Sequence, residues 1–374
     1  MILNYNFRNY NFRLVLYVLA LNCIGLLVIN SASGQDSGLV QKQALGIVLG
    51  LAVMAVISLI PYQKILTYSW GIYAGCIVIL VAVLLFGRNV NGATRWIEVA
   101  GIQFQPSEFV KHGMIVFSSW FLVKHLETLN SIRTLALIAA VFAVPLALIL
   151  EEPNLSTTLV IVFVLVCMVF VAGLSYKWIF GTLAVIVPVL GLLMYLARFT
   201  DVLNRIPFLQ GYQITRVLAW LNPDEYAATG YQQANSIMAI GSGMLHGKGL
   251  NNNTLASVKN GNFLSEEQTD FIFAVIGEEL GFIGCVAVIA LFAVLVYECL
   301  IMAHRAKDMS GKLIGCGVSA LLAFQTFANI AVATGIFPNT GLPLPFISYG
   351  VSSLVSMYIG LGVLLNVGLQ RNMR

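Results

Sequence analysis

Charged residues are scarce in this sequence. Of the 374 residues, 10% are Asp, Glu, Lys or Arg, whereas 59% are apolar and the mean hydropathy is +0.88. A soluble chain of this length needs more charge to cover its surface. The composition therefore excludes a soluble globular protein and predicts a single polytopic membrane domain over residues 1–374.

Several kinds of motif are missing as well. The six cysteines lie inside apolar segments without CxxC spacing or neighbouring histidines, which argues against a disulfide framework and a metal cluster. No module that combines basic and aromatic residues for nucleic-acid binding is present. The run AIGSGMLHGKGL (239–250) is rich in glycine and holds Lys248, but its spacing does not match a nucleotide-binding loop. We therefore expect neither a nucleic acid nor a nucleotide as the ligand.

Long apolar runs dominate instead. About 20 residues of helix cover the hydrocarbon core of a bilayer. Runs of this kind lie at 13–32, 43–60, 67–86, 106–124, 131–150, 155–173, 178–197, 270–300, 312–336 and 346–369. The first run lacks a small-residue cleavage site, so we expect it to be a membrane helix and not a signal peptide. The predicted fold class is an all-α integral membrane protein with about ten transmembrane helices and a long loop, about 198–270, between helices 7 and 8.

The orientation follows from the distribution of Lys and Arg. An even number of spans places both termini on the same side of the membrane, and the segments on that side hold most of the basic residues. The short loops on the other side hold only Lys42, Arg88 and Arg95. Because cytoplasmic loops carry the excess of positive charge, we predict cytoplasmic termini and an extracellular long loop. The net charge of +4 is attributed mostly to this bias.

Four segments that are polar, or rich in Pro and Gly, interrupt the apolar pattern. They are 87–111, 151–154, 198–270 and 337–353. The predicted topology places all four on the outer side of the membrane. We therefore expect them to converge on a shared site at that face.

The first of these segments carries two candidate pairs. Arg95 and Trp96 combine a cation with an aromatic ring, which suits either anchoring at the membrane interface or a binding site. Glu108 and Lys111 are three residues apart on a predicted helix, so they share a face and can pair. Ionisable residues in the first turn of a span are unfavourable unless they pair or line a wet cavity. Both interpretations of Glu108 and Lys111 are open.

The other segments add carboxylates and hydroxyls. Glu151 and Glu152 occupy a tight turn, where they are solvated, contribute to a polar pocket or hold a divalent cation weakly. Asp270 falls where the long loop meets an apolar helix; it is either a functional carboxylate or a helix cap. The prolines of 337–353 prevent a continuous helix, and irregular backbone at membrane depth requires burial in protein or a cavity. Ser348 places a hydroxyl in this segment.

Five motifs follow one another through these segments. They are NGATRW (91–96), QPSEFVK (105–111), GYQQANSIMAIGSGMLHGKGL (230–250), QTDFIFAVIGEELGF (268–282) and GLPLPFISYG (341–350). Together they resemble the SEDS family (shape, elongation, division and sporulation), the RodA, FtsW and SpoVE group of bacterial cell-wall polymerases. The resemblance covers nearly the whole chain, and the loop motifs are more similar to RodA than to FtsW. Two motifs depart from the family: EPNLST (152–157) stands where QPDLGT is common, and SYGVSS (348–353) replaces SYGGSS.

The resemblance implies a glycosyltransferase that polymerises lipid II into glycan strands on the outer face of the bacterial cytoplasmic membrane. Asp270 would be the catalytic carboxylate, which takes the proton from an incoming sugar hydroxyl. Cationic side chains would hold the departing undecaprenyl pyrophosphate, and Glu108 would orient Lys111. The candidates for substrate contact are Arg95, Trp96, Glu108, Lys111, Arg216, Lys248 and Ser348. The resemblance leaves a divalent cation, Mg²⁺ or Mn²⁺, open.

A class B penicillin-binding protein is the implied partner, because this chain has no transpeptidase serine motif of its own. A flippase or transporter for the same lipid is the alternative function, since ionisable residues beside broken helices are typical of transporters too. A non-catalytic scaffold is a third interpretation, and it predicts that Asp270 can be replaced. Roles in elongation, division and sporulation are all compatible with the motifs.

Overall fold

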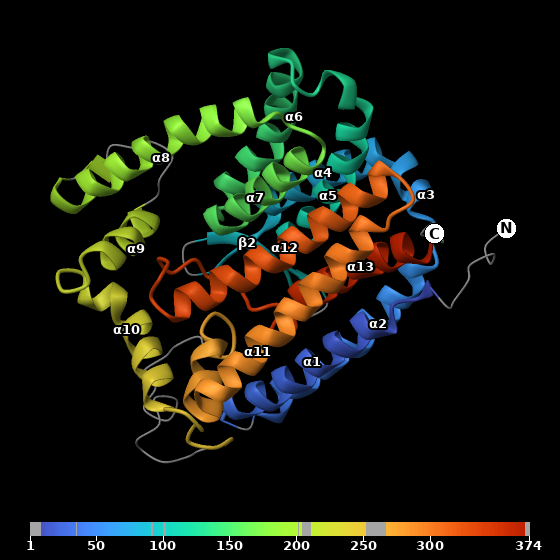
Figure 1. Cartoon of the computed structure of the whole chain (residues 1–374). Coiled ribbons are helices and arrows are strands. Elements are labelled where there is room, and N and C mark those ends of the chain that lie inside the picture. The colour runs from blue at the N-terminus through green and yellow to red at the C-terminus, as the bar shows by residue number, and fades with distance from the viewer. Residues whose placement is uncertain are drawn as a thin grey trace.

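The computed structural model of the chain describes residues 9–34, 36–90, 93–99, 102–200, 202–203, 211–251 and 267–370. Helices form nearly all of it (Figure 1). In chain order they are α1 (Phe12–Ala32), α2 (Ser37–Ser58), α3 (Tyr62–Thr67), α4 (Ser69–Phe86), α5 (Pro106–Lys124), the 3₁₀ turn η2 (Leu126–Thr128), α6 (Ile132–Glu151), α7 (Leu155–Val171), α8 (Tyr176–Phe199), α9 (Gly211–Leu221), α10 (Ala227–Ser242), α11 (Ile272–His304), α12 (Met309–Ala333) and α13 (Val351–Leu369). Three parts of the predicted long loop, 201, 204–210 and 252–266, lie outside the described residues.

Every predicted apolar run coincides with a helix. The runs fall on α1, α2, α4 to α8 and α11 to α13. Among the described residues, 8 of these helices are long and apolar enough to cross a membrane. Helices α5 and α7, with 19 and 17 residues, are not among them. The chain is therefore a multi-pass membrane protein, and ten as the number of spans stays a prediction.

Polar residues in the connections begin several helices. Asn11, Asp36, Asn154 and Asp308 each accept a hydrogen bond from a backbone N–H in the first turn of α1, α2, α7 and α12, respectively. Each bond satisfies a donor that the start of a helix otherwise leaves open. Pro106 occupies the first turn of α5, where its missing N–H is not needed. Local sequence thus sets where these helices begin.

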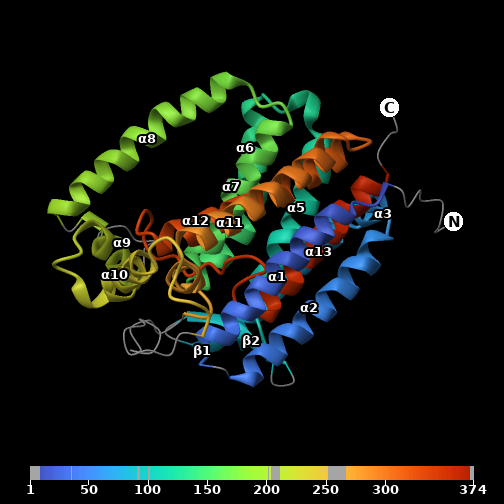
Figure 2. The same ribbon diagram turned by 60° about the horizontal axis from the view of Figure 1, so that its bottom comes forward.

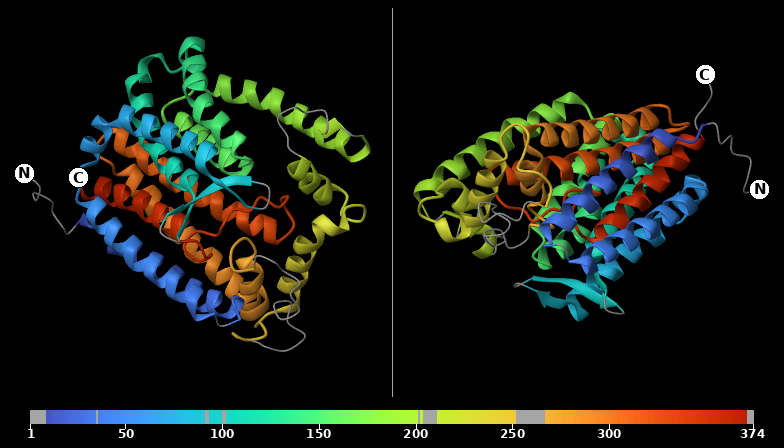
Figure 3. Two further views of the ribbon diagram at one scale, coloured as in Figure 1. Left: turned by 180° about the vertical axis from the view of Figure 1, so that it is seen from behind. Right: turned by 90° about the horizontal axis from the view of Figure 1, so that it is seen from below.

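A small antiparallel sheet lies between α4 and α5, a feature that sequence reasoning did not predict within this nearly all-helical fold. Strands β1 (Arg88–Val90), β2 (Ala93–Val99) and β3 (Ile102–Phe104) pair in the order β1–β2–β3. The sequence Asn91-Gly92 between β1 and β2 favours a two-residue hairpin. The sheet and helices α9 and α10 lie toward one end of the bundle, and α1 begins and α13 ends at the other (Figure 3).

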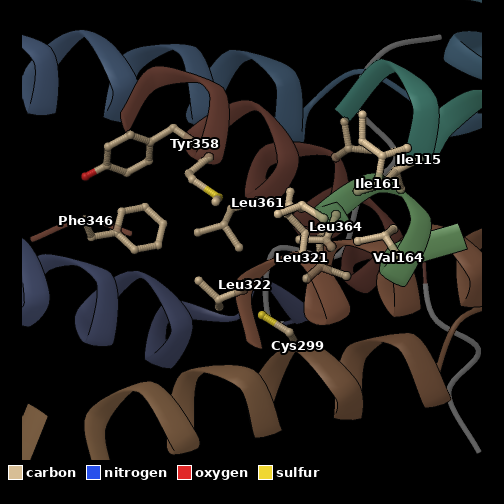
Figure 4. Packing of buried hydrophobic residues seen from close by; sticks show 14 of the residues in the cluster. Ile115, Ile161, Val164, Cys299, Leu321, Leu322, Phe346, Tyr358, Leu361 and Leu364 are labelled. Carbon is tan, nitrogen blue, oxygen red and sulfur yellow. The ribbon is translucent and has the colours of Figure 1, made fainter. Parts of the chain in front are cut away.

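Helix α13 lies in the core of the bundle. Among the candidate spans it has the largest buried share, 83% of its most apolar window. It packs closely on α2, because a Cβ at Gly50 would lie 2.1 Å from the ring of Tyr358. The Tyr358 hydroxyl accepts a hydrogen bond from Asn22 Nδ2 at 2.9 Å, and its ring lies 5.6 Å from that of Phe346 (Figure 4). The absence of a side chain at Gly50 is therefore what admits the aromatic ring.

Helix α8 is arranged differently from the others. It lies apart from the bundle in Figures 1 and 2, and none of its most apolar 18-residue window is buried. Ala197, near its C-terminal end, is its buried residue, and α8 contacts α9. The chain then returns to the bundle through α10, which packs on α11. Helix α9 therefore lies between helix α8, which has few protein contacts, and helix α10, which packs on the bundle.

Helix α11 is interrupted at Gly281, whose φ is 65° and ψ −164°. The interruption changes the direction of nearby backbone groups, and the segment 243–249 bonds to them. The N–H of Lys248 donates to the carbonyl of Glu278 at 2.9 Å. A Cβ at Gly281 would lie 2.3 Å from the nitrogen of Gly247, so both the backbone angle and the contact require glycine. The Gly-rich run therefore fastens the long loop to α11.

Candidate active site

The segment 151–154 contacts two of the other polar segments. Asn154, in the turn between α6 and α7, donates from Nδ2 to the Ser107 hydroxyl at the start of α5, at 3.2 Å. The Tyr212 hydroxyl on α9 donates to the backbone carbonyl of Pro153 in the same turn. The first three polar segments therefore meet, as the topology predicted.

The broken segment 337–350 joins them through buried hydrogen bonds. The Ser348 hydroxyl donates to the carbonyl of Thr269 at 2.6 Å. Asn329 Nδ2, on α12, donates to the carbonyl of Asp270 at 2.9 Å and to a carbonyl of 337–350 at 2.8 Å. Side chains thus satisfy irregular backbone inside the bundle. The fourth segment lies directly beside the junction of the long loop and α11.

Asp270 precedes α11 and does not occupy its cap position. The cap position is Phe271, whose side chain makes no capping hydrogen bond. The Asp270 side chain instead lies against Gly341, where a Cβ would come within 3.2 Å of Oδ2. Gly341 has a φ of +69°, a conformation that other residues adopt only with strain. Backbone geometry and the neighbouring carboxylate both require glycine there.

Arg216 lies on α9 beside the same glycine. A Cβ at Gly341 would lie 3.9 Å from Arg216 Nη1, so the guanidinium and the Asp270 carboxylate border one point. Arg216 Nη1 donates to the carbonyl of Asn339 at 3.4 Å, and the guanidinium lies over the Tyr212 ring, 5.6 Å from its centroid. Burial lowers the pKa of Arg216, and the Asp270 carboxylate opposes that shift. The site therefore holds a half-buried cation close to a carboxylate.

The two carboxylates of the turn between α6 and α7 differ in exposure. Glu151 is exposed, whereas Glu152 is 0% exposed. Burial raises the pKa of Glu152 to about 8, although the charge of Arg95 on β2 opposes the shift. Arg95 also acts electrostatically on Arg216. We call the group linked by these interactions the charged cluster; it consists of Arg95, Glu152, Arg216 and Asp270.

Lys111 forms the predicted pair with Glu108, and the pair is buried. Lys111 Nζ donates to Glu108 Oε1 at 2.8 Å and to Gln325 Oε1 at 3.1 Å, and the lysine side chain is 1% exposed. Gln325 Nε2 in turn donates to the carbonyl of Pro343 at 3.2 Å. The ammonium group is thus linked through Gln325 to the broken segment.

The remaining predicted residues differ in their surroundings. Lys248 pairs with Glu278 on α11 at 2.7 Å. Ser348 is buried, and its hydroxyl accepts from the N–H of Leu344 at 2.8 Å besides its bond to Thr269. Trp96 is half-buried on β2, next to Arg95. The structure thus brings Asp270, Arg216 and Arg95 together, while Lys248 and Ser348 hold neighbouring segments in place.

Metal binding can be assessed for the part of the chain that the structure describes. No group of three or more His, Cys, Asp or Glu side chains there is placed to hold a metal ion. Asp270 and Glu152 are the two carboxyl groups of the charged cluster. A divalent cation at this site therefore stays a prediction that would need ligands from the substrate.

Sequence reasoning did not predict that Glu152 is buried beside the site. It belongs to a turn in which two adjacent carboxylates look equivalent, and the group that acts on it, Arg95, lies far away in the sequence. One signal was present: in EPNLST this glutamate occupies the place of the uncharged Gln of QPDLGT. An acid at a position where an amide is common indicates a carboxyl group in unusual surroundings.

The fold and the charged cluster define a class of protein: a polytopic α-helical membrane protein with a carboxylate and two guanidinium groups gathered at one polar site. Such a site suits group transfer on an anionic substrate. The chain belongs to the family of cell cycle proteins that comprises FtsW, RodA and SpoVE, whose model matches residues 12–373.

Curated relatives of all three kinds are similar over almost their whole length. The probable peptidoglycan glycosyltransferase FtsW of Geobacter metallireducens is 34% identical, over 98% of this chain and 98% of that protein. The peptidoglycan glycosyltransferase MrdB of Escherichia coli K12 is 33% identical, over 96% and 94%. The stage V sporulation protein E of Bacillus subtilis is 37% identical, over 95% of each. Because these identities are so close, a greater similarity to RodA stays a prediction.

Solved structures show the same fold. The rod shape determining protein RodA of Thermus thermophilus is 27% identical and superposes with a TM-score of 0.68, over 100% of this chain and 99% of that one. A chain from a peptidoglycan synthase complex, solved in work on the coordination of polymerization and crosslinking, is 28% identical. It superposes with a TM-score of 0.78, over 96% and 97% of the two chains.

Proposed function

We propose that this chain is a peptidoglycan glycosyltransferase that polymerises lipid II into glycan strands on the outer face of the bacterial cytoplasmic membrane. The observation that carries the proposal is the position of the Asp270 carboxylate, against Gly341 and beside Arg216, where the four polar segments meet. The names of the FtsW and MrdB relatives support the activity.

The charged cluster offers the groups that this reaction needs. Asp270 accepts the proton of the acceptor sugar's 4-hydroxyl while that oxygen bonds to the anomeric carbon of the donor. The bond from that carbon to the pyrophosphate breaks, and negative charge grows on the leaving group. Arg95 and Arg216 stabilise this charge, and they do so more strongly because burial reduces screening by water. The lipid pyrophosphate already activates the donor, so no nucleotide is required.

Several residues support this site by holding neighbouring segments of the protein in position. Lys111 and Glu108 act as positioning residues, since their buried pair reaches the broken segment through Gln325. Ser348 holds the backbone just before Asp270. Lys248 fastens the long loop to α11. Direct contact of these residues with the substrate stays a prediction, and their protein partners favour the positioning roles. Trp96, beside Arg95 on β2, stays a candidate for substrate contact.

A class B penicillin-binding protein is the proposed partner. The chain carries no transpeptidase serine motif, and a similar chain belongs to a complex in which polymerization and crosslinking are coordinated. The cross-linking activity would therefore come from a second protein in the same membrane.

Polymerisation by the purified protein tests the proposed function. In detergent micelles with lipid II, together with its partner, we expect glycan strands longer than one disaccharide. A flippase needs two compartments and produces no polymer under these conditions. Lipid movement in liposomes without polymer formation in micelles would replace our proposal with the transporter alternative.

Cytoplasmic termini are part of the proposal and can be tested by labelling. In a cysteine-free background, Asp224→Cys, exposed between α9 and α10, should react with an impermeant maleimide on intact spheroplasts. Lys307→Cys, exposed between α11 and α12, should react only after permeabilisation. The opposite labelling pattern would place the charged cluster on the cytoplasmic side and contradict the proposed orientation.

A further inference from the structure

Glu152 is a buried carboxyl group that the reaction described above does not use. It is 0% exposed, and neither of its side-chain oxygens has a hydrogen-bond partner among the described residues. An ionised carboxylate in such surroundings is strongly disfavoured, because neither water nor a donor compensates its charge. The geometry therefore favours an uncharged Glu152 that still has a donor and an acceptor to offer.

The charged group that acts directly on Glu152 is Arg95, which links it to the rest of the charged cluster. Arg95 acts on it from β2, and Arg95 Nε is itself buried without a hydrogen-bond partner among the described residues. On α9, Arg216 interacts with Arg95 and with Asp270, and Tyr212 bonds to the residue that follows Glu152. Two neighbouring guanidinium groups repel each other, and an anion bound between them relieves this repulsion. An ionised Glu152 would neutralise one guanidinium group and so weaken the binding of the anion.

We propose that Glu152 is a substrate-binding residue: an uncharged carboxyl group that donates a hydrogen bond to the pyrophosphate of the lipid substrate, next to Arg95. This inference rests on the proposed function and assigns a further contact in the same site. The neutral acid leaves the positive charge of both arginines for the anion and adds an O–H donor. A Gln side chain at this position would likewise offer an uncharged donor of the same length.

The proposal predicts a pH effect with a definite sign. With a pKa of about 8, the protonated fraction of Glu152 falls about tenfold between pH 7 and pH 9. The rate of lipid II polymerisation should fall with it, because Glu152 loses its donor and places a negative charge beside the pyrophosphate. Glu152→Gln cannot ionise, so its ratio of rates at pH 9 and pH 7 should exceed that of the wild type by about fivefold or more.

Glu151→Gln is the matched control, since it makes the same change at the exposed neighbour. The ratio of its rates at pH 9 and pH 7 should equal that of the wild type. Effects of pH on Asp270 and on the substrate are the same in the wild type, Glu151→Gln and Glu152→Gln. If Glu152→Gln loses activity with pH in parallel with the wild type, Glu152 does not donate to the substrate and the proposal is overturned.

A binding measurement tests Glu152 independently of polymerisation. Inorganic pyrophosphate should raise the melting temperature of the wild type at pH 7 and lose most of this effect at pH 9. Glu152→Gln should be stabilised at both pH values, and Glu152→Ala at neither. Equal shifts for all three proteins would overturn the proposal. If the wild type binds pyrophosphate in this pH-dependent way but does not polymerise lipid II, the proposed function fails and the role of Glu152 in anion binding stands.

Discussion

Asp270→Asn should reduce lipid II polymerisation by about 10²- to 10⁴-fold, the usual effect of removing a general base. Asn has the size of Asp and preserves the close contact with Gly341, but it cannot accept the proton of the sugar hydroxyl. The assay is strand formation by purified wild type and variant at equal concentration. A residual rate within a few-fold of the wild type would show that Asp270 is not the base.

The melting temperature of the Asp270→Asn variant shows whether a loss of activity comes from lost catalysis or from lost folding. The residue is tied to the bundle by its backbone carbonyl, which accepts a hydrogen bond from Asn329 Nδ2, and the cap position of α11 is Phe271. We therefore expect a melting temperature close to that of the wild type. Asp224→Asn, at an exposed position between α9 and α10, is the matched control and should keep both activity and stability. A large drop in the melting temperature of Asp270→Asn alone would assign its effect to folding.

Lys111→Met should be the most destabilising of the substitutions considered. Removing one partner of a buried ion pair leaves an uncompensated charge and costs about 3–5 kcal/mol. The pair with Glu108 is that kind of pair, since the two side chains are 1% and 3% exposed. Adding Glu108→Gln removes the stranded carboxylate, so the double variant should regain most of the lost stability. Thermal unfolding in detergent measures both effects.

The activity of the double variant decides the role of Lys111. If the lysine only neutralises Glu108, Glu108→Gln with Lys111→Met should recover polymerisation together with stability, to within about tenfold of the wild type. A double variant that is stable but inactive would show that the ammonium group is needed beyond neutralising Glu108, either for its bond to Gln325 or for contact with the pyrophosphate. Glu278→Gln, which breaks the partly exposed pair with Lys248, is a useful comparison and should have a smaller effect on stability.

The helical part of this fold could be predicted because it depends on local properties. Each apolar run was long enough to show a helix on its own, and caps such as Asn154 and Asp308 marked helix starts. The convergence of the four polar segments followed from topology alone. The sheet was missed because β1 and β3 have only 3 residues each, too few for an alternating pattern to stand out.

The details of the site depend on contacts between distant parts of the chain. Lys111 is bonded to Gln325, 214 residues away, and Lys248 to Glu278, 30 residues away. Nothing local indicates such partners, so the sequence showed four cations that looked equally suited to bind a phosphate. The structure separates them, because Arg95 and Arg216 interact electrostatically with each other and with carboxyl groups of the charged cluster, whereas Lys111 pairs with Glu108 and Lys248 with Glu278.

Helix α8 has a consequence for how relatives of this chain diverge. Its side chains have few protein neighbours, so exchanges among Leu, Ile, Val and Phe change little as long as length and hydropathy are kept. Helix α13 is the opposite case, because its close approach to Gly50 leaves few alternatives for Tyr358. We therefore expect relatives of this chain to differ more in α8 than in α13. We also expect the length of the apolar stretch of α8 to follow the thickness of the membrane.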